Sequence, residues 1–238
     1  ISEFKPDIVI GTGGYVCGPV VLCAALMKIP SIIHEQNVIP GMTIKLLSKY
    51  ASTVAISFSE SRKYLKTRKK IIHTGNPVRQ EIIETDMKAA RRRLKLDDRP
   101  FILAFGGSLG ADKINSTLVE YIKNMPDKSA VQIMIGTGER QYRKIVNGIK
   151  EQGIDIARYK NIQITPYINN MHEVMAAADL VVCRSGAITI SELTAIGKPA
   201  ILIPSPNVTN NHQEYNARAL EKKGAATVIT ENNLSGFK

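Results

Sequence analysis

The chain has 238 residues, of which 44% are hydrophobic and 22% are charged, values close to those of average soluble globular proteins. This composition excludes general disorder. The longest apolar stretch, Val16 to Met27, is interrupted by Gly18 and Pro19 and is too short to span a membrane. The net charge of +11 is unevenly placed, because 13 Lys or Arg stand against 6 Asp or Glu in the 40 residues from 60 to 99.

An anionic membrane surface explains this basic segment at least as well as nucleic acid does. Aromatic residues make up only 5% of the chain and Trp is absent, so side chains on which bases could stack are scarce. The segment Gly41 to Ala51 predicts a basic amphipathic helix with Lys45 and Lys49 on one side. Its other side carries the apolar residues Met42, Leu46 and Leu47. An ordinary surface helix whose Leu residues pack inward is the alternative.

Short apolar runs alternate with helical patterns along the whole chain, which predicts parallel sheets with helices on both faces. The expected strands are Asp7–Ile10, Ser31–His34, Thr53–Ile56, Lys70–Ile72, Phe101–Phe105, Ala130–Ile135, Asn161–Thr165, Leu180–Cys183, Ala200–Ile203 and Ala226–Ile229. The cysteines Cys17, Cys23 and Cys183 sit among apolar neighbours without the spacing of a zinc or redox site, and we expect buried free thiols.

The composition changes once, after Gly75 to Arg79, where a charged helix is predicted over Glu81 to Leu96. We therefore place a domain boundary near Arg79, with one domain over 1–79 and the other over 80–238. The second has six predicted strands and fits a doubly wound parallel sheet. The first has only four, and because the sequence opens on a strand without Met, we expect it to be the incomplete part of a longer chain.

Ligands of open parallel sheets bind beyond the carboxyl ends of the strands, and this rule selects loops of unusual composition. The glycine-rich turn Gly11 to Gly18 follows the first strand, and it fits either a tight turn or a phosphate or sugar contact, but not a dinucleotide fingerprint. The polar run His34-Glu35-Gln36-Asn37 follows the second strand. His34 is a candidate general base, with an orienting or structural role as the alternative.

Three later loops carry the same kind of signal. Phe105 to Ala111 contains Gly-Gly-Ser before a helix, which predicts a cradle for a diphosphate and is not a Walker loop. The second loop runs from Cys183 to Glu192, and its Thr189 and Glu192 have the spacing of a capping box. In the alternative interpretation, the N–H groups of residues 187–189 hold phosphate oxygens. Glu192 then accepts both hydroxyls of a ribose. In Asn210 to Asn216, a second capping box (Asn211 with Glu214) competes with sugar contacts from His212, Gln213 and Asn216.

Six ordered segments together resemble one enzyme family: G-x-GGY-x-x-GP, HEQN, GNPVR, GGS-x-GA, CRSGA-x-T-x-SE and NHQ-x-x-NA. The chain is similar over residues 5–231 to the MurG family, bacterial transferases that move GlcNAc from UDP-GlcNAc to lipid I, forming lipid II in peptidoglycan synthesis. The resemblance implies the GT-B fold, in which two Rossmann-like domains face each other. It also implies a peripheral enzyme on the cytoplasmic face of the bacterial membrane.

The resemblance further implies roles for individual residues. Glu192 would bind the ribose, Ser108 a phosphate, and Arg79 and Ile168 would frame the nucleotide. Further donor contacts would come from Ala187, Ile188 and Thr189 at a helix N-terminus and, for the sugar, from Asn37, Gln213 and Asn216. The turn Gly13-Gly14-Tyr15 would face the pyrophosphate of lipid I. His212 departs from the pattern, because many relatives carry Gln there.

The expected reaction is an inverting displacement at the anomeric carbon that needs neither a metal nor another cofactor. The resemblance places a further glycine-rich loop with a His before Ile1, so the catalytic base is expected there, with His34 the candidate within the chain. We therefore expect this chain to bind donor without turning it over. A UDP-GlcNAc 2-epimerase-like enzyme and a catalytically silent UDP-sugar-binding module remain alternatives.

Overall fold

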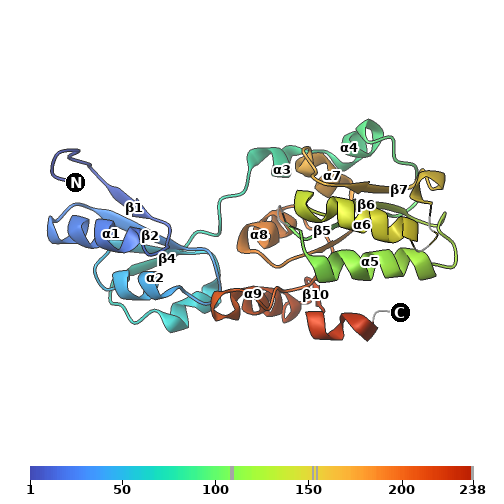
Figure 1. Ribbon diagram of the computed structural model, residues 1–238. Coiled ribbons are helices and arrows are strands. Elements are labelled where there is room, and N and C mark those ends of the chain that lie inside the picture. Colours follow the sequence, from blue (N-terminus) through green and yellow to red (C-terminus); the bar gives the residue numbers. More distant parts are fainter. Residues whose placement is uncertain (108–109, 152, 154, 237–238) are drawn as a thin grey trace. The chain divides into compact units, whose positions relative to one another are not determined.

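The computed structural model describes residues 1–107, 110–151, 153 and 155–236, and the chain divides into two compact units, each built on a parallel β-sheet (Figure 1). Unit 1 comprises Ile1–Pro77 together with the later segment Val208–Asn216. Unit 2 comprises Val78–Asn207 and Ala217–Lys238. Among the described residues, no helix is long and apolar enough to cross a membrane.

The sheet of unit 1 has four parallel strands in the order β1-β2-β3-β4. Their bounds are β1 (Val9–Gly11), β2 (Ser31–Glu35), β3 (Thr53–Ile56) and β4 (Lys70–His73). The connections contain α1 (Cys17–Leu26), α2 (Met42–Leu47) and the 3₁₀ helix η1 (Ser59–Tyr64). Because the strand order follows the chain order, each new strand is added on the same side of the sheet and the winding does not reverse within this unit.

The core of unit 1 lies on one face of its sheet, where α1 and α2 pack against each other. Val21 of α1 and Leu47 of α2 are buried there with β-strand residues such as Ile33. Side chains alternate along a strand, so Ile10 and Ile72 point to the opposite face, and they are 65% and 36% exposed. In this unit the two α-helices thus share one face, whereas the repeating pattern had predicted helices on both.

The sheet of unit 2 has six parallel strands in the order β10-β9-β8-β5-β6-β7. The strands are β5 (Phe101–Phe105), β6 (Gln132–Gly136), β7 (Ile162–Thr165), β8 (Leu180–Cys183), β9 (Ala200–Leu202) and β10 (Thr227–Val228). The chain builds outward from β5 through β6 to β7 and then returns to β8 on the other side of β5. The direction of winding therefore reverses between β5 and β8, which is the switch point where doubly wound sheets bind ligands.

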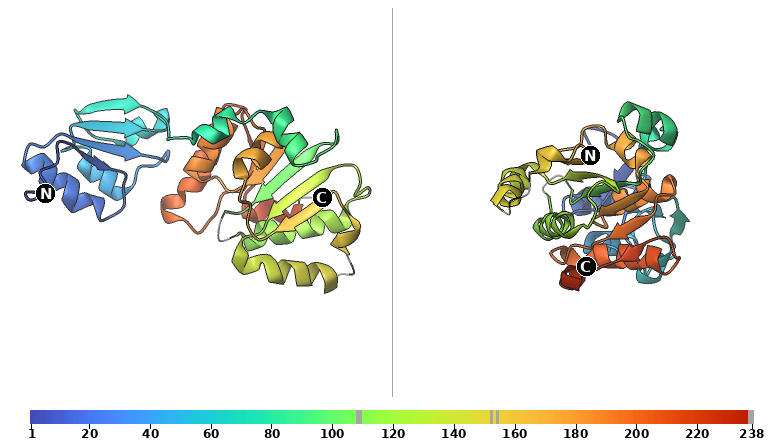
Figure 2. Two further views of the ribbon diagram at one scale, coloured as in Figure 1. Left: turned by 90° about the horizontal axis from the view of Figure 1, so that it is seen from above. Right: turned by 90° about the vertical axis from the view of Figure 1, so that its right-hand side faces the viewer.

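Helices cover both faces of this six-stranded sheet (Figure 2). One face carries α5 (Asp112–Asn124) packed against α6 (Glu139–Glu151), and the other carries α7 (Met171–Ala177) packed against α3 (Gln80–Glu84) and α4 (Met87–Arg93). The remaining helices are η2 (Ile156–Arg158), α8 (Ala187–Ala195), η3 (Thr209–Asn211), α9 (His212–Glu221) and η4 (Glu231–Gly236). The helix α9 begins in unit 1 and ends in unit 2.

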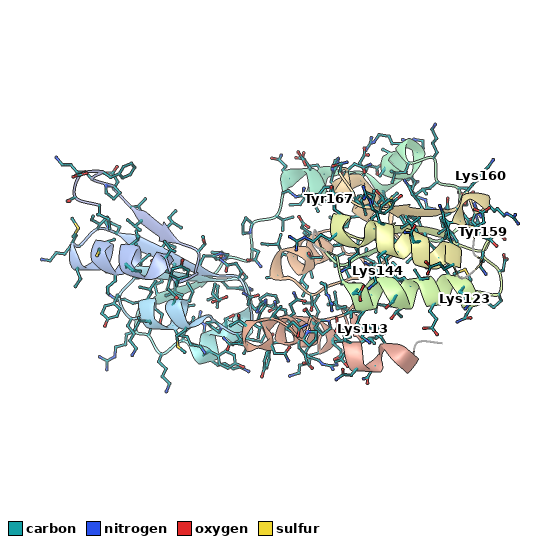
Figure 3. All side chains as sticks on the ribbon, in the orientation of Figure 1. Lys113, Lys123, Lys144, Tyr159, Lys160 and Tyr167 are labelled. Atoms are coloured by element: carbon teal, nitrogen blue, oxygen red, sulfur yellow. The ribbon has the colours of Figure 1, made fainter. Side chains whose placement is uncertain are left out.

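The helix α5 shows why the charged residues of unit 2 do not disturb its core. Ile114 and Ile122 are buried against the sheet, while Lys113 and Lys123 are exposed and point away from it (Figure 3). Apolar residues three or four apart share one face of a helix, so the Lys residues next to them in the sequence face away from the sheet and reach solvent. The positive charge of this helix lies on its solvent-facing side.

All ten predicted strands are present, with bounds within two residues of those expected at each end. The predicted helix over Glu81 to Leu96 is wrong as a single element: it is broken at Thr85 and Asp86. The Asp86 carboxylate accepts a 2.8 Å bond from Ala89 N and thereby starts a new helix, α4. The expectation of three buried thiols holds only for Cys183, since Cys23 is exposed.

Candidate functional site

A pocket of ≈ 210 Å³ lies at the carboxyl end of the six-stranded sheet. The loops after three successive strands, β5, β6 and β7, form most of its wall, and α7 and α8 complete it. The lining residues are Arg79, Phe105, Gly107, Gly136, Gly138, Pro166, Tyr167, Ile168, Asn169, Met171, Met175 and Glu192. The pocket thus lies where the strand order predicts a ligand, and it brings together Arg79, Ile168 and Glu192.

An ion pair stands in the wall of this pocket. Nε of Arg79 donates to Oε1 of Glu192 at 3.1 Å. The Glu192 side chain is only 9% exposed and the Arg79 side chain is 54% exposed. Oε2 of Glu192 has no hydrogen-bond partner among the described residues, so this carboxylate has capacity for hydroxyl donors from a ligand.

Two glycines allow the loops at this pocket to pack closely. A Cβ on Gly110 would lie 2.1 Å from the carbonyl oxygen of Thr137, and the φ of +77° there also favours glycine. A Cβ on Gly136 would lie 3.1 Å from Cδ1 of Ile168, which lines the pocket. The absence of side chains at both positions lets the loops after β5 and β6 approach each other and Ile168 closely.

The N-terminus of α8 faces the carboxyl edge of the same sheet. The helix begins at Ala187 after Gly186, and Ile190 N donates the first bond, to Gly186 O at 3.0 Å. The N–H groups of Ile188 and Thr189 therefore have no acceptor within the helix, as at any helix start. The predicted capping box of Thr189 with Glu192 is wrong, because the helix starts two residues before Thr189. Glu192 lies in its interior, paired with Arg79.

Contacts of the Arg184 side chain fix the loop between β8 and α8. Arg184 donates from Nη1 to the carbonyl oxygens of Ile203 and Pro204, both at 3.2 Å, and forms an ion pair with Glu231. Burial raises the pKa of the neighbouring Cys183 thiol to about 12, so this thiol stays protonated at neutral pH. Arg184 thus fixes the loop, and Cys183 fills the core beneath it.

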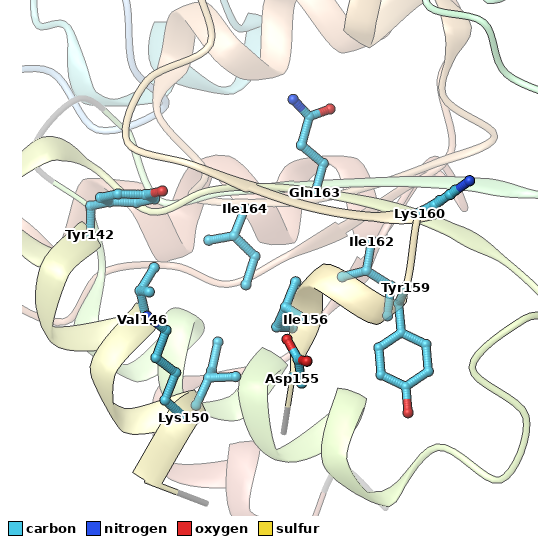
Figure 4. A pocket seen from close by; sticks show the side chains of 11 residues that line it. Tyr142, Val146, Lys150, Asp155, Ile156, Tyr159, Lys160, Ile162, Gln163 and Ile164 are labelled. Atoms are coloured by element: carbon cyan, nitrogen blue, oxygen red, sulfur yellow. The ribbon is translucent and has the colours of Figure 1, made fainter. Parts of the chain in front are cut away.

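A second pocket of ≈ 500 Å³ lies at the sheet edge of unit 2, among α6, η2 and the edge strand β7. Ile156, Ile162 and Ile164 point into it, whereas Gln163 points to the other side of β7 (Figure 4). It contains none of the residues predicted from the sequence. Although it is larger, it lacks a buried carboxylate and a glycine loop, so we assign the ligand site to the smaller pocket.

In unit 1, the polar run His34 to Asn37 at the end of β2 binds mainly other parts of the protein. Oε1 of the buried Glu35 accepts from Asn37 N at 2.9 Å, and Oε2 accepts from Gly41 N at 2.9 Å. Oδ1 of Asn37 accepts from Nδ2 of Asn216 at 3.0 Å, and Oδ1 of Asn216 accepts from Val38 N at 2.9 Å. Asn37 and Asn216, both predicted as sugar contacts, are therefore hydrogen-bonded to each other.

The candidate base His34 has partners at both ring nitrogens. Its Nε2 lies 3.0 Å from Gly75 O and 3.0 Å from Ser57 Oγ, and its Nδ1 lies 3.3 Å from Nε2 of Gln36. A carbonyl oxygen can only accept, so Nε2 carries the proton and Nδ1 accepts from Gln36. This geometry holds the chain at Gly75 to the sheet, which is an orienting role.

The other predicted residues are dispersed. Gly13 and Gly14 both have positive φ, at +99° and +76°, and Tyr15 is 87% exposed in the same turn. Gln36 Nε2 holds this turn through Thr12 O at 2.9 Å. Gln213 lies in the first turn of α9. Ser108 lies outside the described residues.

The second predicted capping box has an altered form. Asn211 has a φ of +50° and ends η3, and its Nδ2 donates to Oε2 of Glu214 at 2.6 Å. The two side chains therefore contact each other, as the spacing predicted, while Asn211 keeps a left-handed backbone. Nδ1 of His212 lies 2.9 Å from Thr209 O, so this ring is bound to its own turn.

Sequence reasoning missed several pocket residues. Tyr167, Met171 and Met175 line the pocket, yet none of them was singled out. The signal for Tyr167 was its place two residues after a predicted strand, at the edge where ligands bind. Among the described residues, no group of three or more His, Cys, Asp or Glu is placed to hold a metal ion.

Comparison with known proteins connects this geometry to one enzyme family. The model of the glycosyltransferase family 28 C-terminal domain matches residues 101–238, and that of the glycosyltransferase family 28 N-terminal domain matches residues 1–56. A transferase of Acetivibrio thermocellus is 54% identical over 98% of this chain and 62% of its own length. One from Thermoanaerobacter sp. strain X514 is 52% identical over 100% of this chain and 65% of its own length.

Both relatives are named UDP-N-acetylglucosamine–N-acetylmuramyl-(pentapeptide) pyrophosphoryl-undecaprenol N-acetylglucosamine transferase. Among solved structures, Acinetobacter baumannii MurG has a TM-score of 0.76 and 32% identity, over 97% of this chain and 62% of that one. The fold is shared by a putative UDP-N-acetylglucosamine 2-epimerase from Listeria monocytogenes, which is 16% identical and has a TM-score of 0.68. That match covers 100% of this chain and 66% of the other. The chain thus spans less than two thirds of the curated relatives' length.

Proposed function

Because the chain belongs to glycosyltransferase family 28, we propose that it binds UDP-GlcNAc and that its protein transfers GlcNAc to lipid I. The product is lipid II, the anomeric carbon is inverted, and no resident metal or cofactor takes part. The observation that carries the proposal is the buried Glu192 carboxylate in the wall of the pocket at the switch point. The names of the relatives at 52–54% identity support the choice of donor and acceptor.

The nucleotide is proposed to bind in the pocket of unit 2. Glu192 accepts the two ribose hydroxyls, since a carboxylate offers two oxygens in one plane. Arg79 keeps one of these oxygens in place, and Ile168 supplies an apolar wall for the base. These three residues recognise the uridine.

The leaving diphosphate is proposed to bind at the start of α8. Negative charge grows on UDP as the bond to the anomeric carbon breaks, and the N–H groups of Ile188 and Thr189 are donors at the positive end of a helix dipole. Ala187 belongs to the same turn, and the sequence resemblance supports Ser108 as a further phosphate contact. Sugar contacts are proposed for Asn37, Gln213 and Asn216.

The acceptor and the membrane are proposed to meet unit 1. The turn Gly13-Gly14-Tyr15 faces the pyrophosphate of lipid I, and the exposed apolar side chain of Met42 lies beside basic residues. Such a surface binds anionic lipids through both charge and apolar area. We accordingly propose that the protein acts on the cytoplasmic face of the bacterial membrane.

Calorimetric titration of the chain with UDP-GlcNAc, UDP-glucose and GDP-mannose tests the donor. The tightest binding is expected for UDP-GlcNAc, and a chain that binds none of them, or prefers the GDP-sugar, contradicts the proposal. Release of UDP in the full-length protein should require a lipid I analogue. Conversion of UDP-GlcNAc without any acceptor would instead favour an epimerase.

A further inference from the structure

The ion pair of Arg184 with Glu231 has no part in the functions proposed so far. Both side chains are mostly buried, with 16% and 15% of their surface exposed. Nη2 of Arg184 donates to Oε1 of Glu231, while its Nη1 donates to the carbonyl oxygens of Ile203 and Pro204, both at 3.2 Å. One guanidinium thus connects three segments of unit 2: the loop after β8, the loop after β9 and the start of η4.

The carboxylate of Glu231 is held in place by the core of the same unit. Glu231 is the first residue of η4, and Leu234, one turn later in this 3₁₀ helix, is 5% exposed. Leu234 packs in the same hydrophobic cluster as Ile114 of α5 and Ile203. Because the core anchors η4, the ion pair restrains the Arg184 side chain against a fixed partner.

Arg184 transmits this restraint to the beginning of α8. It directly follows β8, and only two residues separate it from Ala187, the first residue of the helix. The N–H groups of Ile188 and Thr189, which are the proposed donors to the diphosphate, lie in the first turn of that helix. A hydrogen bond weakens steeply when its angle departs from linearity, so these donors are effective only if the loop holds the helix start in one direction.

We propose that Glu231 is a positioning residue for the diphosphate of the donor, acting through Arg184 on the first turn of α8. The inference rests on the proposed function, which assigns the diphosphate to this turn. Without the carboxylate, a mostly buried guanidinium has no counter-charge and turns toward solvent, because an unpaired buried charge is costly. The loop after β8 then loses its bonds to Ile203 and Pro204.

The test compares the affinities of uridine and UDP in the 238-residue chain and in Glu231→Ala. The Kd of uridine should stay within about twofold, because Glu231 does not line the nucleotide pocket. The advantage of UDP over uridine should fall about tenfold, the equivalent of one misaligned hydrogen bond to the diphosphate. A general loss of stability would instead weaken the binding of both ligands.

Glu231→Gln separates positioning from a direct effect of charge. Its amide keeps an oxygen that accepts from Nη2 of Arg184, so the loop stays in place and most of the UDP affinity should return. If Glu231 acted on the diphosphate through its negative charge, both Glu231→Ala and Glu231→Gln would bind UDP more tightly than the wild type. That result overturns the proposal.

Glu173→Ala is the matched control. The Glu173 side chain is 18% exposed and pairs with Arg93 in the same unit, so the change removes a carboxylate of similar burial together with its ion pair. This variant should bind uridine and UDP with wild-type affinities.

Arg184→Lys tests the same link from its other end and serves if Glu231→Ala does not fold. An ammonium group is a point charge and does not reproduce the fork with which the guanidinium joins its three acceptors. The variant should lose a similar share of the diphosphate-dependent affinity, and the double variant should lose no more than either single one.

Two results would overturn the positioning role: an unchanged advantage of UDP over uridine in Glu231→Ala, or an equal loss of affinity for both ligands. A wild-type chain that binds neither ligand, or binds UDP no better than uridine, refutes the proposed function instead.

Discussion

Replacement of Glu192 by Gln is the most direct perturbation of the nucleotide pocket. The change keeps the shape of the side chain and one acceptor oxygen, but it removes the negative charge. The Glu192 side chain is 9% exposed, and its Oε2 has no partner among the described residues. Two ribose hydroxyls that donate to this carboxylate would form charge-assisted hydrogen bonds, each worth about 1.5–3 kcal/mol.

The expected loss is one such bond, because the amide can still accept one hydroxyl. A loss of about 2 kcal/mol corresponds to a rise of about thirtyfold in the Kd of UDP. Folding stability should change much less. The partner Arg79 is 54% exposed, so the lost ion pair costs at most about 1 kcal/mol. Glu192 is also not a helix cap, so no capping energy is lost.

Calorimetry with UDP, together with a thermal melt of the unliganded chain, separates the two effects. Glu173→Gln is a matched control, because Glu173 pairs with Arg93 in the same unit and that Arg side chain is likewise 54% exposed. The control should bind UDP like the wild type. If Glu192→Gln also binds UDP with wild-type affinity, the carboxylate does not contact the ribose and the assignment of the pocket is refuted.

Two further predictions concern the surface and the core. Binding of the chain to vesicles that contain anionic lipid should fall steeply as the salt concentration rises. It should also weaken in Leu46→Ser, since Leu46 is 55% exposed beside Lys45 and Lys49. Equal binding to neutral vesicles would contradict this prediction. Iodoacetamide at pH 8 should modify the exposed Cys23 but not Cys183, whose pKa is raised to about 12 by burial; mass spectrometry that finds Cys183 modified in the folded chain would disprove it.

The strands and the location of the site were predictable from the sequence because both depend on local patterns. Apolar runs mark buried strands, and glycine or polar residues directly after them mark the edge where ligands bind. This reasoning offered Glu192 as a ribose contact, in competition with a capping box. Arg79 and Ile168 came only from the resemblance, since nothing local links residues 113 apart in the chain. Their meeting in one pocket is a result of the strand order.

The errors arose where individual side chains depart from the regular spacing of apolar residues along a helix. Thr85 and Asp86 interrupt an otherwise regular helical pattern because an Asp side chain can start a helix by bonding a backbone N–H. In the predicted amphipathic helix, Leu47 is completely buried whereas Leu46 is exposed. Adjacent residues of a short helix face in different directions, so the grouping of these two on one side was wrong.

Glu35 and Asn37 show a limit of another kind. Four consecutive polar residues after a strand indicate a ligand-facing loop, yet Glu35 turns inward and binds the backbone of its own loop. No local pattern could show this, because the partner of Asn37 is Asn216, at the other end of the chain. The sequence signal of a functional loop and that of a structural link are the same.

The grouping of Val208–Asn216 with unit 1 has an evolutionary consequence. Recombination between related genes that exchanges everything after Arg79 would also replace the segment that supplies Asn216. A hybrid remains intact only if the incoming segment offers an amide to the resident Asn37 and an acceptor to the N–H of Val38. Residues 37 and 216 should therefore be inherited together, so viable crossovers would carry both from one parent or join parents that share them.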